Sequence, residues 1–245
     1  MANLLRHQPG FVLIVLCAGG FAATAVSGDK PTVPSFTERT ESAGVSFTHE
    51  TTLEILEEVQ YMNPGGAAAD FNNDGWIDLF LQVGTGQNAA LFINNGDGMF
   101  TDQADSWNVN LTAVEGTFAA VGDIDGNGFV DVYAGALYAR NYLYLNTGDN
   151  SFVESAYDAG VAMDYDSNLP PFAENTFGAT FGDIDLDGDL DLYACSWTPS
   201  LVGNILFENY GDGRFSDVTE AADVNINDEA YWLFSPTIVD MNDDR

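Results

Sequence analysis

Short acidic clusters recur along the chain, and their spacing is that of ligands for a hard cation. The clusters are DFNNDGWID from Asp70, DIDGNGFVD from Asp123, DIDLDGDLD from Asp183 and DMNDDR from Asp240. Calcium takes about six to eight oxygen ligands, which carboxylates, side-chain amides and backbone carbonyls supply. A nine-residue loop can provide the side chains of positions 1, 3, 5 and 9 and the carbonyl of position 7. The clusters therefore predict one calcium ion in each complete loop.

The candidate ligands follow from this register, and glycine stands at position 6 of each complete loop, where a sharp bend favours a residue without a Cβ. The ligands would be Asp70, Asn72, Asp74, Asp78 and the Trp76 carbonyl in the first loop; Asp123, Asp125, Asn127, Asp131 and the Phe129 carbonyl in the second; Asp183, Asp185, Asp187, Asp191 and the Asp189 carbonyl in the third; and Asp240, Asn242 and Asp244 in the incomplete fourth.

Other cations and a metal-free loop fit the pattern less well. An EF-hand would carry a bidentate Glu at position 12, where Leu81, Ala134 and Ala194 stand. Magnesium demands octahedral geometry, and the Cys and His ligands typical of zinc are missing from the loops. Asp and Asn also form turns without any metal. Clustered carboxylates repel one another unless a cation compensates them, so we expect calcium.

The charge of the whole chain narrows the classes of partner. Asp and Glu number 38 against 6 Lys plus Arg, which gives a formal net charge of -32. Such a charge repels nucleic acids and anionic lipid headgroups. Apolar residues make up 46% of the chain, which is enough for a substantial core. We therefore expect a folded protein that does not bind nucleic acid.

The N-terminus has the features of an export signal. Arg6 and His7 precede the apolar stretch Phe11 to Val26, and small residues surround Ser27, so we expect a signal peptide over residues 1–28. The stretch is shorter than the roughly 20 residues that span a bilayer. A lipid anchor on Cys17 is disfavoured by the large Leu16 before it. The predicted mature protein is secreted or displayed at the cell surface and has no membrane span.

Self-similarity along the chain predicts the architecture. The acidic clusters start 53, 60 and 57 residues apart. Each complete cluster lies between a Gly-rich strand and an alternating strand, and a hairpin follows, such as LFINNGDGMF from Leu91. Four short antiparallel strands in 50 to 60 residues are typical of one blade of a β-propeller. The predicted fold class is therefore all-β, a β-propeller of four-stranded blades.

The repeats indicate an incomplete propeller over residues 29–245. We expect blades at about 64–112, 116–163 and 175–227 and the start of a fourth from 231. Phe36 precedes Val45 by nine residues, the spacing seen between Phe100 and Val109, so the N-terminal segment resembles an outer strand. Such a strand could complete a closed ring, which hides sheet edges. We expect seven blades in the full-length protein.

The motifs together resemble the FG-GAP/VCBS repeats, and most closely the repeat region of the ASPIC/UnbV proteins related to cartilage acidic protein. The resemblance spans Phe36 to Arg245 and rests on FTERTESAGVSFTHE, the three Asp loops, NNGDGMFTD and RFSDVTEAADV. Similar repeats in integrin α chains are calcium-bearing propellers used in adhesion, so the resemblance implies that role. Two features depart from the family: its C-terminal module is not present, and the second hairpin has Asn150 in place of the final Gly.

Two functions are consistent with these features. The first is a non-enzymatic scaffold whose calcium-bound loops help to present a surface to an extracellular protein or glycan. The alternative is the propeller portion of an extracellular carbohydrate-active enzyme, in which paired acids act as general acid and base. Every Asp of the three loops already has a ligand role, and the chain shows no nucleophile elbow and no phosphate loop. We therefore favour the scaffold.

Overall fold

The computed structural model describes residues 35–48, 65–82, 84, 87–109, 111, 115–137, 139–164, 176–196, 204–224 and 235–241. The chain divides into two compact units, residues 1–38 and 39–245, and the fold described below is that of the second. The expected signal peptide lies outside the described residues, as do Asn242 and Asp244 of the fourth loop.

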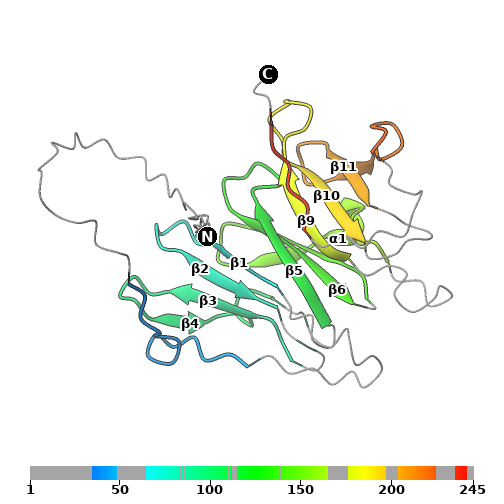
Figure 1. Cartoon of the computed structure of the whole chain (residues 1–245). Coiled ribbons are helices and arrows are strands. Elements are labelled where there is room, and N and C mark those ends of the chain that lie inside the picture. Colours follow the sequence, from blue (N-terminus) through cyan, green and yellow to red (C-terminus); the bar gives the residue numbers. More distant parts are fainter. Residues whose placement is uncertain are drawn as a thin grey trace, which may run out of the picture. The chain divides into compact units, whose positions relative to one another are not determined.

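The structure confirms the predicted all-β class. Its strands form three separate four-stranded antiparallel sheets, each a simple meander in chain order (Figure 1). We call these sheets blades one, two and three. Their strands are β1 Gly66–Ala69, β2 Asp78–Leu81, β3 Ala90–Asn94 and β4 Phe100–Asp102; β5 Glu115–Gly122, β6 Asp131–Leu137, β7 Tyr142–Asn146 and β8 Phe152–Glu154; and β9 Thr176–Gly182, β10 Asp191–Ser196, β11 Ile205–Asn209 and β12 Phe215–Asp217. One short helix, α1 Ala156–Ala159, follows β8.

Neighbouring blades contact each other along their first strands, because β1 lies against β5 and β5 against β9. Glycine permits this approach. A Cβ on Gly65 would lie 2.6 Å from the Cα of Phe118, which belongs to β5. A Cβ on Gly122 would lie 2.8 Å from Cδ1 of Leu190 in the next blade. The Gly-rich character of the first strands is therefore a packing requirement as well as a strand signal.

Each core lies between two blades. The first cluster joins Phe80 and Leu91 of blade one to Tyr144 and Phe152 of blade two, and Trp107 is almost fully buried in it. The second cluster joins Leu143 of blade two to residues of blade three. Apolar side chains on both faces of a sheet are what blade-against-blade packing requires.

Cys195 lies in strand β10 and is buried, as its LYACSW setting predicts. Burial raises the pKa of its thiol to about 11. The sulfur is therefore a neutral thiol at neutral pH and a structural side chain.

The segment that precedes blade one contains the turn that follows the outer strand of each blade. In every case a valine N–H donates to the carbonyl five residues earlier: Val45 to Thr40, Val109 to Ala104, Val161 to Ala156 and Val224 to Thr219. The N–H of Phe100 donates to the carbonyl of Ala43 at 2.8 Å, as that of Phe152 does to Trp107. Residues 39–45 thus meet blade one as the tail of blade one meets blade two, and no strand is formed in this segment.

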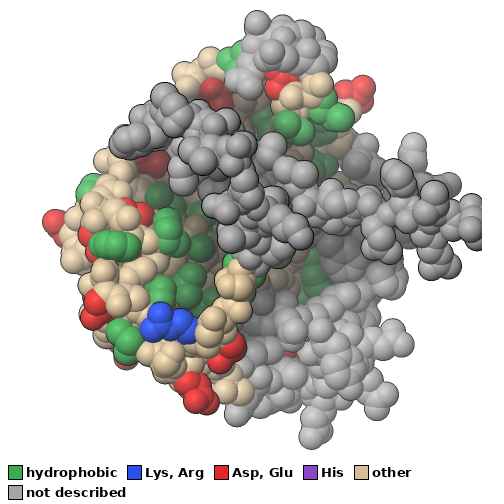
Figure 2. Space-filling view, turned by 60° about the vertical axis from the view of Figure 1, so that its left-hand side comes forward, with side chains coloured by type: hydrophobic (Ala, Val, Ile, Leu, Met, Phe, Trp, Pro, Cys, Tyr) green, Lys and Arg blue, Asp and Glu red, His purple; other side chains and the backbone are tan. Residues whose placement is uncertain are grey.

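The surface reflects the composition. Acidic side chains stand at many points of the described part of the face in Figure 2, whereas basic side chains are seen at one place. No helix among the described residues has the length and apolar character needed to cross a membrane.

Candidate metal centres

The three complete Asp loops occupy one position in the fold, the hairpin between the first and second strands of each blade. Glycine at position 6 has a positive φ in each loop, between 90° and 103°. Its N–H donates to the Asp at position 1: Gly75 to Asp70 at 2.7 Å, Gly128 to Asp123 at 2.9 Å and Gly188 to Asp183 at 3.1 Å. The predicted bend is therefore present, and it holds the first carboxylate of each loop.

The Asp at position 9 closes its loop from within the blade. In the second loop, Asp131 Oδ2 accepts the N–H of Ile124 at 2.7 Å, and Oδ1 accepts the N–H of Asn146 at 2.7 Å. Asp78 and Asp191 make the same pair of bonds in the other loops. All three side chains are at most 1% exposed. These carboxylates are structural clamps, a role beyond the expected ligand role.

Burial also changes the electrostatics of these clamps. It raises the pKa of Asp131 to about 7, and the negative charges of Asp125 and Asp123 add to the rise. The pKa values of Asp78 and Asp191 are raised for the same two reasons. Hydrogen bonds from backbone N–H groups act in the opposite direction. A buried negative charge next to other carboxylates is the setting in which a bound cation stabilises the folded state most.

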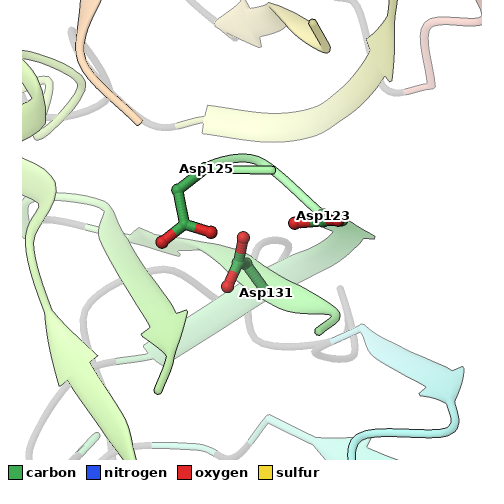
Figure 3. A group of neighbouring side chains, drawn as sticks. All are labelled: Asp123, Asp125 and Asp131. Carbon is green, nitrogen blue, oxygen red and sulfur yellow. The ribbon is translucent and has the colours of Figure 1, made fainter. Parts of the chain in front are cut away.

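Carboxylates converge in the second and third loops. Ligand oxygens of Asp123, Asp125 and Asp131 lie within 4.8 Å of one another, and the three side chains approach a common point in Figure 3. The third loop brings Asp183, Asp185 and Asp187 together within the same distance. Acidic groups meeting at this spacing are a suitable donor set for a hard divalent cation.

A second observation fits a cation at these two clusters. Oδ1 of Asp123 and Oδ1 of Asp183 are buried, and neither accepts a hydrogen bond in the structure. Both are the position-1 carboxylate, whose Oδ2 already accepts the glycine N–H. A buried carboxylate oxygen without a partner is costly, so the same orphaned atom at the same place in two loops is what an oxygen-coordinated cation would satisfy.

The first loop is arranged differently. Asp70 accepts backbone N–H groups on both oxygens, from Asp74 at 3.0 Å and from Gly75 at 2.7 Å. Asn72 donates its amide N–H to Asp74 at 2.9 Å. The carboxylates of the first loop do not form a group of three of the kind found in the second and third loops. Internal hydrogen bonds therefore supply part of what the cation would supply elsewhere.

Asn127, at position 5 of the second loop, presents its amide N–H to the acidic group. Its Nδ2 donates to Asp125 Oδ2 at 3.2 Å and to the carbonyl of Asn146 at 2.7 Å, while its Oδ1 accepts the N–H of Phe129. Asp187 holds the equivalent position in the third loop and belongs to the carboxylate cluster. The third loop thus offers a carboxylate where the second offers an amide.

The position-7 residues lie beside the hairpin that follows in the same blade. Their N–H groups donate to the side chain at position 5, for example Trp76 to Asp74 at 2.8 Å. A Cβ on Gly96 would lie 2.9 Å from Trp76 Nε1, and one on Gly148 would lie 2.6 Å from a ring carbon of Phe129. Asp189 stands against Gly211 in the same way. In the fourth loop, only Asp240 of the expected ligands is described.

Sequence reasoning missed the asparagines that end the third strand of each blade. Asn94, Asn146 and Asn209 read as turn residues, yet each donates its N–H to the position-9 Asp of its own blade. The available signal was their recurrence two residues before the hairpin glycine in NNGDG, NTGDN and NYGDG.

Comparison with known proteins gives a family match. A family model described as FG-GAP-like repeat matches residues 70–134 and 123–194, which together span just over half of the chain. No curated protein matches the sequence.

Several solved structures match, and one of them has 19% identity and a TM-score of 0.34 over 61% of this chain. That structure is of an Agrocybe aegerita lectin, and its description concerns the specific recognition of non-reducing terminal N-acetylglucosamine by the lectin. The present chain covers 36% of that lectin chain.

Proposed function

Because the chain belongs to the FG-GAP-like repeat family, we propose that its Asp loops bind Ca²⁺ and that the blades form a calcium-stiffened scaffold for an extracellular protein or glycan. The orphaned, buried Oδ1 atoms of Asp123 and Asp183 carry this proposal, because each lies in a cluster of three carboxylates. Bound calcium would supply charge compensation and fixed loop geometry. The loop residues supply the oxygen ligands, and the backbone N–H groups orient them.

The scaffold is proposed as non-catalytic and exported. The position-9 acids accept backbone N–H groups on both oxygens, which favours a structural role for them over proton transfer. Residues 1–28 would be removed on export, and mass spectrometry of the secreted protein would show whether the N-terminus begins near Gly28. We also propose kinship with the ASPIC/UnbV proteins, on the motifs described above; a full-length sequence that continues into their C-terminal module would support it.

Calorimetric titration of the mature protein tests the metal proposal. We expect Ca²⁺ to bind with dissociation constants of roughly 10⁻⁴ to 10⁻³ M, as in other extracellular sites. Asp183→Asn should remove one bound ion, because it takes the charge of the position-1 carboxylate from the third cluster while keeping an acceptor for the N–H of Gly188. Asp149→Asn is the matched control, since Asp149 is an exposed turn residue outside the loops. Equal binding by wild type and Asp183→Asn would contradict the assignment.

A further inference from the structure

Asn209 connects two Asp loops that belong to different blades. Its Nδ2 donates to the carbonyl of Ile124, position 2 of the second loop, at 2.8 Å and to the carbonyl of Leu190 in its own loop at 3.0 Å. Its N–H donates to Asp191, and its Oδ1 accepts the N–H of Gly211 at 3.0 Å. The side chain is 2% exposed. One buried residue is therefore bonded to both the second and the third loop.

Asn146 makes the equivalent connection between the first and second loops. Its Nδ2 donates to the carbonyl of Phe71, position 2 of the first loop, at 2.8 Å and to the carbonyl of Val130 at 3.2 Å. Its N–H donates to Asp131, and its side chain is 1% exposed. The same bridge thus occurs at both junctions between described blades, which argues against a chance contact.

The bridges join the position-9 clamps into one series. Ile124 donates its N–H to Asp131 and accepts Asn209 on its carbonyl, so the loop-two clamp is linked through Ile124 to the loop-three clamp, Asp191. Phe71 links Asp78 to Asn146 in the same way. A further bond runs from Asn73 Nδ2 to the carbonyl of Gly128 at 2.9 Å. Each described loop is therefore hydrogen-bonded to the loop of a neighbouring blade.

We propose that Asn146 and Asn209 are positioning residues that couple neighbouring Asp loops, so that a cation in one loop raises the cation affinity of the next. The inference rests on the proposed calcium binding. A cation that draws the carboxylates of one loop together fixes the position-2 carbonyl and the position-9 clamp. Through the asparagine, that ordering extends to the adjacent loop before its own cation binds. The second cation then loses less free energy in ordering its loop, so the two sites bind cooperatively.

Asn94 provides the matched control. It occupies the same position in blade one, donates its N–H to Asp78 and accepts the N–H of Gly96. Its Nδ2 donates to the carbonyl of Ile77 within its own blade, at 3.1 Å. Asn94→Ala therefore removes comparable contacts within a blade without breaking a bridge between the described loops.

The test is a Ca²⁺ titration of the mature protein in which calorimetry measures the binding. We expect positive cooperativity in wild type and in Asn94→Ala, with a Hill coefficient above 1. In Asn209→Ala we expect the second and third loops to bind independently of each other, with the affinity of the second loop lowered at least about 5-fold, the lower end of typical coupling between sites. Unchanged cooperativity in Asn209→Ala, or independent sites in wild type, would overturn the coupling. Absence of any Ca²⁺ binding by wild type would instead overturn the proposed function.

A second measurement leaves the asparagines intact and therefore holds if Asn209→Ala does not fold. Asp183→Asn disables the third cluster, and the affinity remaining in the second loop reports the coupling directly. We expect that affinity to fall about 5-fold relative to wild type. An unchanged affinity of the second loop would show that the loops bind independently and that Asn209 has only a structural role.

Discussion

Replacing Asp131 with Ala is expected to lower the free energy of unfolding by about 3 kcal/mol in chelator, and by more when calcium is present, because Asp131 also belongs to the carboxylate cluster. The change leaves the N–H groups of Ile124 and Asn146 without their acceptor inside the blade. Each buried donor without a partner costs about 1 to 3 kcal/mol. Removal of a buried charge offsets part of that loss. For a protein with a typical stability of about 5 to 15 kcal/mol, the remaining effect is large.

Denaturant unfolding in chelator measures this loss, with Asp125→Ala as the contrast. Among the described residues, Asp125 accepts hydrogen bonds from the backbone and side chain of Asn127, in the exposed part of the loop. Its removal should therefore destabilise the protein mainly when calcium is present. A loss below about 1 kcal/mol for Asp131→Ala in chelator would show that the clamp is not structural.

The pH dependence of stability should reverse its sign between the calcium-free and the calcium-loaded protein. Without calcium, the pKa of Asp131 is raised from 3.8 to about 7, so the folded state binds this proton more tightly than the unfolded state. Stability then falls as pH rises through the window from 3.8 to about 7. We expect a loss of about 2 kcal/mol between pH 5 and pH 7 from this group.

Calcium should invert that slope, because a bound cation favours the ionised carboxylate and protons compete with it. Self-repulsion from the net charge of -32 also makes the calcium-free protein more stable at acid pH, where carboxylates are protonated. The contribution of Asp131 therefore needs a control. In the calcium-free protein, Asp131→Asn should reduce the slope of the free energy of unfolding against pH by the contribution of about one proton. Asp149→Asn should leave that slope close to that of wild type. Thermal unfolding across this pH range makes the comparison, and parallel slopes with and without calcium would contradict the account.

The Asp loops show how far local spacing can predict a structure. Side-chain spacing and a glycine at position 6 predicted a bend between two strands, because both are properties of a few consecutive residues. The recurrence of these motifs also predicted the four-stranded sheets. The loop geometry around Gly128 and Gly188 follows these expectations.

The features that local spacing could not predict depend on contacts between distant residues. Asn146 reaches Phe71 across 75 positions, and Asn209 reaches Ile124 across 85. The spacing also does not show which carboxylate oxygens already accept hydrogen bonds, since both oxygens of Asp70 accept backbone N–H groups. The three loops therefore look alike in sequence but differ in how many carboxylates converge.

Diffraction from crystals of the mature protein grown in millimolar calcium, with anomalous data that identify the ion, tests the central claim most directly. We expect a peak bounded by Asp123, Asp125 and Asp131 and another bounded by Asp183, Asp185 and Asp187, each with oxygen ligands at about 2.3 to 2.6 Å. Both clusters without a peak under those conditions would contradict the claim that these loops are calcium sites.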